Sequence, residues 1–452
     1  MTIKSFKNRR SKNFFTAGVT LSLTILAFLI VPMNLQAEDT TYIAIGKAKT
    51  KKTVLALPDF QAEKSVSAGA SKALEVVRKD LGFLDSFELV AESKMKDTSP
   101  GIKPGSFPLE AWKEASTDYV LKAQATPGER GIVIEAYLTD VNSGSSTLSK
   151  KYVTTLGEAT TLGHTIANDI VKAITGEPGI FETKLTMVCD RTGKKEIYVM
   201  DFDGSNVRQI THHRSVVFGP AWSPDGGRIA YSLISKNKKN IKNTNLFEFD
   251  FKTSSIKMLS DRSGINSGAH YHPDGKRLAL TMSFLGNPEI FVLDPATKSA
   301  TRLTNSSGMD VDPNWSPDGK FVSFVSSRAG APMVYRMNAD GSNVQRLTFA
   351  GSFNATPAWS PKNNKIGFAG WLDGRFDIFT MNPDGTTIER LTKGQGNNED
   401  PSFSGDGNFL VFSSNRAGGK NIYVMGLDGG GVKRLTYGLG NCTSPRWSPP
   451  TR

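Results

Sequence analysis

The sequence predicts an α/β N-terminal domain followed by an all-β six-bladed β-propeller, which is closed by pairing the C-terminal strand with the first blade. Two observations carry this prediction. A unit of about 44 residues recurs through the second half of the chain, and each copy contains four short extended runs. The last copy stops after its first run, whereas the first copy lacks that run.

Length and composition are those of an ordinary globular protein. The 452 residues leave room for two domains, and 38% of them are hydrophobic and 22% charged. The only cysteines are Cys189 and Cys442, which excludes a disulfide-dense scaffold and a cysteine-rich zinc module.

The N-terminus has the pattern of a cleaved signal peptide. A basic head containing Arg9 and Arg10 precedes an apolar run over residues 14–31, and Ala37 supplies a small residue for cleavage. We therefore expect residues 1–37 to be removed and the protein to be periplasmic; an uncleaved membrane anchor is the alternative. Cleavage removes five Lys/Arg and no Asp/Glu, so the net charge falls from +12 to +7. This modest charge gives no reason to expect nucleic acid as a partner.

Residues 38–178 lack the repeat and are predicted to form the α/β domain. Extended runs are expected at residues 42–45, 54–57, 87–91, 119–123 and 132–139. Helices are expected at residues 65–81, 109–115 and 158–175, the last with apolar residues every four positions. Gly176 and Pro178 then predict a helix end and a short linker.

Residues 179–452 are predicted to form the propeller. Each unit carries an aromatic residue, usually followed by Ser-Pro-Asp-Gly, and successive aromatic positions lie 49, 44, 44, 44 and 44 residues apart. These positions are Trp222, Tyr271, Trp315, Trp359, Phe403 and Trp447. The aromatic segment is assigned to the inner strand, and Pro-Asp-Gly to the turn after it. We expect the aromatic rings to pack between neighbouring blades.

The phase of the repeat predicts how the ring closes. Trp447 opens a unit with no room for a second strand, while residues 185–189, 197–200 and 207–211 supply strands two to four of a unit without an inner strand. The C-terminal strand would complete this blade and remove exposed sheet edges. The spacing of 49 places five extra residues in a lysine-rich loop at residues 235–243, interpreted either as a solvated loop or as a basic finger.

The order of signal peptide, α/β domain and Trp-Ser-Pro-Asp-Gly propeller resembles the TolB family, and the linker at residues 174–184 is similar to the junction between its domains. The resemblance covers nearly the whole mature chain. It implies a periplasmic, non-enzymatic component of the Tol–Pal envelope system that supports outer-membrane integrity and constriction during cell division. The implied partners are the peptidoglycan-associated lipoprotein Pal and the TolA C-terminal domain, with other envelope lipoproteins as a further class.

The resemblance places Pal on the loops before the inner strands. The corresponding residues are Ile265, Asn266, Ser267, Gly268, Asp310, Val311, Asp312, Asn354, Ala355, Thr356, Asn398, Glu399 and Asp400. It also implies that TolA binds the mature N-terminus. There Tyr42, Ile43, Ala44 and Ile45 have the character that strand addition needs, although they are equally consistent with the first strand of the domain.

Two other function classes are considered. One is a propeller that binds a glycan or peptide independently of Pal, and the other is a propeller enzyme. No nucleophile elbow, zinc-binding helix or phosphate-binding glycine loop occurs in the sequence, and neither a cofactor nor a metal is expected. An alternative role for part of the predicted partner-binding set is a cation site at the channel mouth, with ligands from Asp310, Asp312, Glu399 and Asp400.

Cys189 and Cys442 both fall in the closing blade, one at the end of the second strand and the other before Trp447. In an oxidising compartment we expect them to form a disulfide, with two buried free thiols as the alternative.

Overall fold

The computed structural model describes residues 51–237 and 239–450. The predicted signal peptide and the segment Tyr42 to Ile45 lie outside these residues. In the described part of the chain, no helix combines the length and the apolarity needed to cross a membrane.

The N-terminal region is a mixed sheet. β1 (Thr53–Ala56) pairs in parallel with β3 (Phe87–Leu89) and β4 (Tyr119–Gly128), and the short β2 (Gln61–Ala62) also pairs with β4. β4, β5 (Gly131–Asp140) and β6 (Ser146–Thr154) form an antiparallel meander. Alternate residues of β5, such as Ile132 and Ile134, are fully buried, so this strand follows the period of two.

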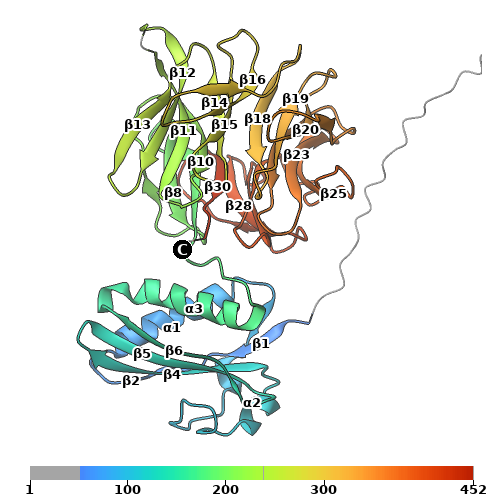
Figure 1. The fold of residues 1–452 in the computed structure, drawn as a ribbon. Coiled ribbons are helices and arrows are strands. Elements are labelled where there is room, and N and C mark those ends of the chain that lie inside the picture. Colours follow the sequence, from blue (N-terminus) through green and yellow to red (C-terminus); the bar gives the residue numbers. More distant parts are fainter. Residues whose placement is uncertain (1–50, 238, 451–452) are drawn as a thin grey trace, which may run out of the picture. The chain divides into compact units, whose positions relative to one another are not determined.

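Two helices lie on one side of this sheet, α1 (Ser67–Leu81) and α3 (Ala159–Thr175) (Figure 1). The shorter α2 (Glu110–Glu114) precedes β4, and two 3-10 turns lie at Glu92–Lys94 and Leu156–Glu158. Ile166 and Ile170 of α3 are fully buried, in agreement with the predicted apolar face. α3 ends at Thr175, and Gly176 caps it in the left-handed conformation, with a φ of 80°.

The rest of the chain forms six four-stranded antiparallel sheets, which confirms the predicted six-bladed propeller. The first blade contains β30 (Cys442–Trp447), β7 (Lys184–Cys189), β8 (Glu196–Asp201) and β9 (Arg208–Gln209). The second contains β10 (Val217–Trp222), β11 (Arg228–Lys236), β12 (Lys242–Asp250) and β13 (Ser255–Ser260). The third contains β14 (Asn266–Tyr271), β15 (Leu278–Met282), β16 (Glu289–Leu293) and β17 (Ala300–Arg302).

The remaining three blades repeat this order. The fourth contains β18 (Asp310–Trp315), β19 (Phe321–Ser326), β20 (Met333–Asn338) and β21 (Gln345–Arg346). The fifth contains β22 (Asn354–Trp359), β23 (Ile366–Leu372), β24 (Arg375–Met381) and β25 (Glu389–Arg390). The sixth contains β26 (Asn398–Phe403), β27 (Phe409–Ser414), β28 (Asn421–Gly426) and β29 (Lys433–Arg434).

The ring closes as predicted, through strands from opposite ends of the propeller. β30 is the inner strand of the first blade and pairs antiparallel with β7, with Trp447 opposite Leu185 and Cys442 opposite Cys189. The structure joins the two cysteines in a disulfide. Beyond the strand, the backbone N–H of Ser448 donates to the carbonyl of Lys184 at 2.8 Å.

Neighbouring blades are held together by aromatic packing and by a repeated hydrogen bond. The side chain of the fifth residue of one inner strand accepts a hydrogen bond from the backbone N–H of the aromatic residue that ends the inner strand of the next blade. His270 Nδ1 accepts from Trp315 N at 3.2 Å, and Asn314 Oδ1 accepts from Trp359 N at 3.1 Å. Trp315 is 2% exposed, as expected for a ring packed between blades.

Candidate functional site: the entry face of the propeller

The strand order gives the propeller two different faces. The interblade loops and the hairpin turns between second and third strands lie on the face where the inner strands begin, which we call the entry face. The turns after the inner strands, such as Ser316-Pro317-Asp318-Gly319, lie on the opposite face, which we call the turn face. The residues that the sequence assigned to partner binding belong to the entry side of the channel.

Except for Ile265, these residues lie in the inner strands and not, as the sequence had suggested, in the loops before them. Asn266, Asp310, Asn354 and Asn398 are each the first residue of an inner strand. They already pair with the second strand, and all four are 0–3% exposed. The expectation of exposed loop residues is therefore wrong for these positions. Ile265, which precedes β14, is 36% exposed.

The first residues of the inner strands serve the blade rather than the surface. Arg328 Nη2 donates to Asp310 Oδ2 at 2.8 Å, and Arg416 Nη2 donates to Asn398 Oδ1 at the same distance in another blade. Ser306 also donates to Asp310 Oδ2 at 3.2 Å. A buried carboxylate with these partners is a structural anchor, because burial of an unpaired charge would be costly.

The second residues, Ser267, Val311, Ala355 and Glu399, are half-buried. The third residue of every inner strand has a positive φ between 49° and 62°, at a register shift in the ladder. These residues are Gly219, Gly268, Asp312, Thr356, Asp400 and Ser444. Such bulges turn side chains out of the ladder, and all six positions line a channel cavity of about 180 Å³.

The channel carries charges of both signs. Asp312 and Asp400 face it together with Arg446 and His270. Burial raises the pKa of the Asp312 carboxyl, and the negative charge of Asp400 raises it further. Burial, reinforced by the positive charge of Arg446, lowers the pKa of His270 to about 4.

The four carboxylates considered as cation ligands do not converge. Asp310 pairs with Arg328 and Glu399 pairs with Lys420, which leaves Asp312 and Asp400 in the channel. Among the described residues, no group of three or more His, Cys, Asp or Glu side chains could hold a metal ion.

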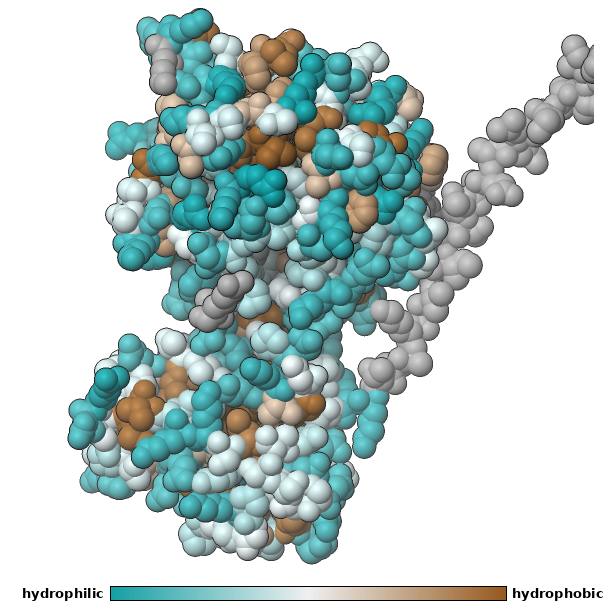
Figure 2. All heavy atoms as spheres, viewed as in Figure 1, coloured by the Kyte–Doolittle hydropathy of each residue, from teal (hydrophilic) through white to brown (hydrophobic). Residues whose placement is uncertain are grey.

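The entry face is distinguished by exposed apolar side chains, which the repeat pattern of the sequence does not predict. Figure 2 shows hydrophobic residues among polar ones over the part of the propeller that carries the labels β14, β16 and β18 in Figure 1. The exposed large apolar residues of this face are Val216, Ile241, Ile265, Leu285, Met309, Phe349, Phe353, Trp371 and Tyr437. Apolar residues gathered on one face mark an interaction surface.

An aromatic cluster forms the strongest part of this surface. Phe353 and Trp371 are 38% and 36% exposed, and both pack edge-on against Phe376, at centroid distances of 5.7 and 5.0 Å. Trp371 N donates to the carbonyl of Phe353 at 2.7 Å, which fixes the two residues side by side. Phe349, 72% exposed, lies under the guanidinium of Arg346. Rigid aromatic side chains of this kind dominate protein interfaces.

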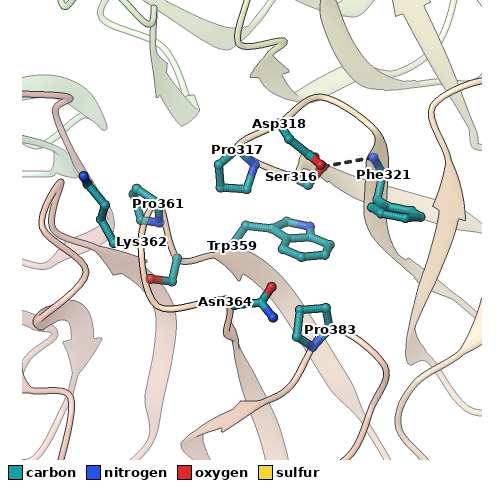
Figure 3. A pocket seen from close by; sticks show the side chains of 10 residues that line it. Ser316, Pro317, Asp318, Phe321, Trp359, Pro361, Lys362, Asn364 and Pro383 are labelled. Atoms are coloured by element: carbon teal, nitrogen blue, oxygen red, sulfur yellow. Dashed lines mark hydrogen bonds between the residues drawn. The ribbon is translucent and has the colours of Figure 1, made fainter.

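The turn face has a different character. It carries a pocket of about 270 Å³. Figure 3 shows this pocket between Trp359 and the turn at Ser316, with Pro317, Pro361 and Pro383 around it. Ser316 Oγ accepts from Phe321 N at 2.9 Å and donates to Asp318 Oδ1 at 2.6 Å, so the repeated Ser and Asp build the turn. This supports the assignment of these aspartates to turn geometry.

The fold defines a class of protein, a closed six-bladed β-propeller preceded by a mixed α/β sheet domain. Family models agree with both parts: the TolB β-propeller domain matches residues 171–369 and 352–452, and the TolB amino-terminal domain matches residues 41–147. The chain belongs to the TolB family.

Individual relatives give the same result. The chain is 38% identical over 214 residues to the Tol-Pal system protein TolB of Geobacter sulfurreducens, covering 46% of this chain and 49% of that protein. It is 34% identical over 221 residues to the TolB homolog of Chlorobium chlorochromatii, covering 48% and 50%. These matches span about half the length of each curated relative. The crystal structure of TolB from Acinetobacter baumannii aligns with a TM-score of 0.77 and 26% identity, over 90% of this chain and 98% of that one.

Proposed function

We propose that this protein is a periplasmic, non-enzymatic component of the Tol–Pal system whose entry face binds the peptidoglycan-associated lipoprotein Pal. Family membership supports the assignment to the system, because several relatives carry the name Tol-Pal system protein TolB. The roles in outer-membrane integrity and cell division follow from that assignment. The predicted signal peptide at residues 1–37 would deliver the protein to the periplasm.

The aromatic cluster of Phe353, Trp371 and Phe376 is the observation that carries the choice of face. Exposed aromatic side chains cost free energy in the unbound protein, and this cost is recovered when a partner removes them from water. Ile265 is the one predicted contact residue that is itself exposed on this surface. The channel-lining Asp312 and Asp400 would contact only a segment that enters the channel.

The mature N-terminus is the proposed second site. Tyr42, Ile43, Ala44 and Ile45 would bind the TolA C-terminal domain by adding a strand to its sheet, as the family resemblance implies. The test is deletion of residues 38–45. Binding of a TolA C-terminal domain should be lost while Pal binding remains, and unfolding of the α/β domain would contradict the proposal.

Calorimetric titration with Pal lacking its lipid tests the entry face. We expect the double variant Phe353→Ser and Trp371→Ser to bind at least about thirtyfold more weakly, since the loss of even one hot-spot aromatic costs about 2 kcal/mol or more. Val344→Ser and Val432→Ser form the matched control, because these residues are similarly exposed, at 37% and 40%, and precede outer strands. Equal affinity of the Phe353/Trp371 variant and the unmodified protein would contradict the proposal.

A further inference from the structure

The second blade carries a hairpin that is longer than those of the other blades. β11 and β12 have nine residues each, whereas β15 and β16 have five, and β19 and β20 have six. Their ladder runs without a break from Arg228 opposite Asp250 to Lys236 opposite Lys242. In Figure 1 the β11–β12 hairpin extends beyond the neighbouring strands of the entry face. The extra residues therefore form a β finger rather than a solvated loop.

The finger is held in one conformation by asparagine side chains. At the tip, Asn237 is 9% exposed, and its Oδ1 accepts from the backbone N–H groups of Lys239 and Ile241 at 3.0 and 3.1 Å. At the root, Asn243 Nδ2 donates to the carbonyl of Arg262, while its Oδ1 accepts from Gly264 N. The finger is thus fixed to the loop that leads into Ile265 on the entry face.

This rigid hairpin concentrates positive charge. Lys236, Lys239 and Lys242 are exposed, and within the described residues none of the three has a carboxylate at ion-pair distance. Lys236 and Lys242 stand directly opposite each other, an arrangement that is unfavourable for an isolated hairpin. Residues 235–245 contain no Asp or Glu. An anionic partner would relieve this repulsion.

We propose that the finger, defined by Lys236, Lys239 and Lys242, binds a cluster of carboxylates on the protein that occupies the entry face. The inference rests on the proposed function and adds to it an electrostatic contact beside the apolar one. A protein fits better than a membrane, because the finger is anchored beside the apolar surface and exposes one large apolar side chain, Ile241, for insertion. Charges at the edge of an interface act mainly on the association rate.

Stopped-flow association with Pal lacking its lipid, measured across a range of salt concentrations, tests the finger. The triple variant Lys236→Gln, Lys239→Gln and Lys242→Gln should associate about tenfold more slowly at low salt and show a weaker salt dependence. Its dissociation rate should stay within about twofold of that of the unmodified protein. The control triple, Lys252→Gln, Lys257→Gln and Lys276→Gln, removes the same charge from exposed lysines away from the entry face and should associate like the unmodified protein.

Each outcome decides the inference. Equal association rates and equal salt dependence for the finger triple and the unmodified protein would overturn it and leave the proposed function standing. If the finger triple loses binding to vesicles containing phosphatidylglycerol while its association with Pal is unchanged, the finger contacts a membrane and the inference is overturned. If the unmodified protein does not bind Pal at all, the proposed function and the finger contact both fall.

Discussion

His270 of the third blade accepts a hydrogen bond from the backbone N–H of Trp315 in the fourth, with 3.2 Å between Nδ1 and N. Nδ1 can accept only while it carries no proton, so this interblade contact requires a neutral imidazole. Burial and the charge of Arg446 favour the same neutral form.

Replacement of His270 with Asn should make the propeller more resistant to acid. The pKa of His270 is lowered from 6.5 to about 4, so its contribution is present above pH 6.5 and is lost as the pH falls toward 4. The loss of stability between these pH values is at most about 3 kcal/mol, and the partial solvent exposure of His270 reduces it. Asn keeps the contact, because Asn314 makes the same bond to Trp359. Urea unfolding at pH 7 and pH 4.5 measures the difference, with His212→Asn as an exposed control. A His270→Asn variant that loses as much stability in acid as the unmodified protein would contradict this account.

Deletion of residues 445–452 should open the ring. The deletion removes Trp447, whose Nε1 donates to Thr183 Oγ1 at 2.8 Å, and it exposes the edge of β7. We expect aggregation or rapid proteolysis, measured by light scattering and limited trypsin digestion. A matched deletion of residues 451–452 should leave the protein intact. Unchanged thermal stability of the longer deletion would refute closure by β30.

Loss of the disulfide should destabilise the propeller without changing its fold. Cys189 and Cys442 are 253 residues apart, and in the chain-entropy model a loop of this length contributes about 5 kcal/mol, of which about 2–4 kcal/mol is typically realised. The double variant Cys189→Ala and Cys442→Ala should unfold at a correspondingly lower denaturant concentration. A reductant should lower the stability of the unmodified protein and leave that of the double variant unchanged. Mass spectrometry that finds two alkylatable thiols in periplasmic protein would rule the bond out.

Charge reversal at Asp310 should unfold the propeller rather than merely weaken partner binding. Lys at this position would place a buried positive charge against Arg328, at a cost of about 3–5 kcal/mol. Asp310→Asn should be milder, because Asn398 accepts from Arg416 in the same geometry. Thermal unfolding separates the two variants, with the exposed Glu129→Lys as a control. Stability of Asp310→Lys close to that of the unmodified protein would mean that this residue is not an anchor.

The sequence predicts the architecture well because the repeat is regular. Aromatic positions, turns and the incomplete last unit determine the number of blades and the way they close. β6 was not predicted, since its exposed residues, in the segment Ser146–Thr154, include two adjacent lysines and little alternation of apolar side chains. β2 has only two residues and gives no pattern to detect.

The site was harder to predict because repeat position does not reveal exposure. Its repeat position predicts Asp310 to be a surface residue, whereas in the structure it is buried and bound by Arg328, 18 residues later. Arg328 and Arg416 occupy the same position in two repeats, and this recurrence in the sequence indicates a structural partner within the blade. Trp371 is a second signal in the sequence, since the equivalent residues of other repeats, Ser283, Ser327 and Asn415, are polar. A large apolar residue at a polar repeat position indicates a surface used for binding.

Hydrogen–deuterium exchange of the full chain, with and without Pal lacking its lipid, identifies the face of the propeller that Pal covers. We expect Pal to slow backbone exchange in residues 349–353 and 371–376, and in the loop before β14 that contains Ile265. Exchange in the Ser-Pro-Asp-Gly turns of the opposite face should stay unchanged. Protection confined to those turns, or to the α/β domain, would contradict the assignment of the entry face.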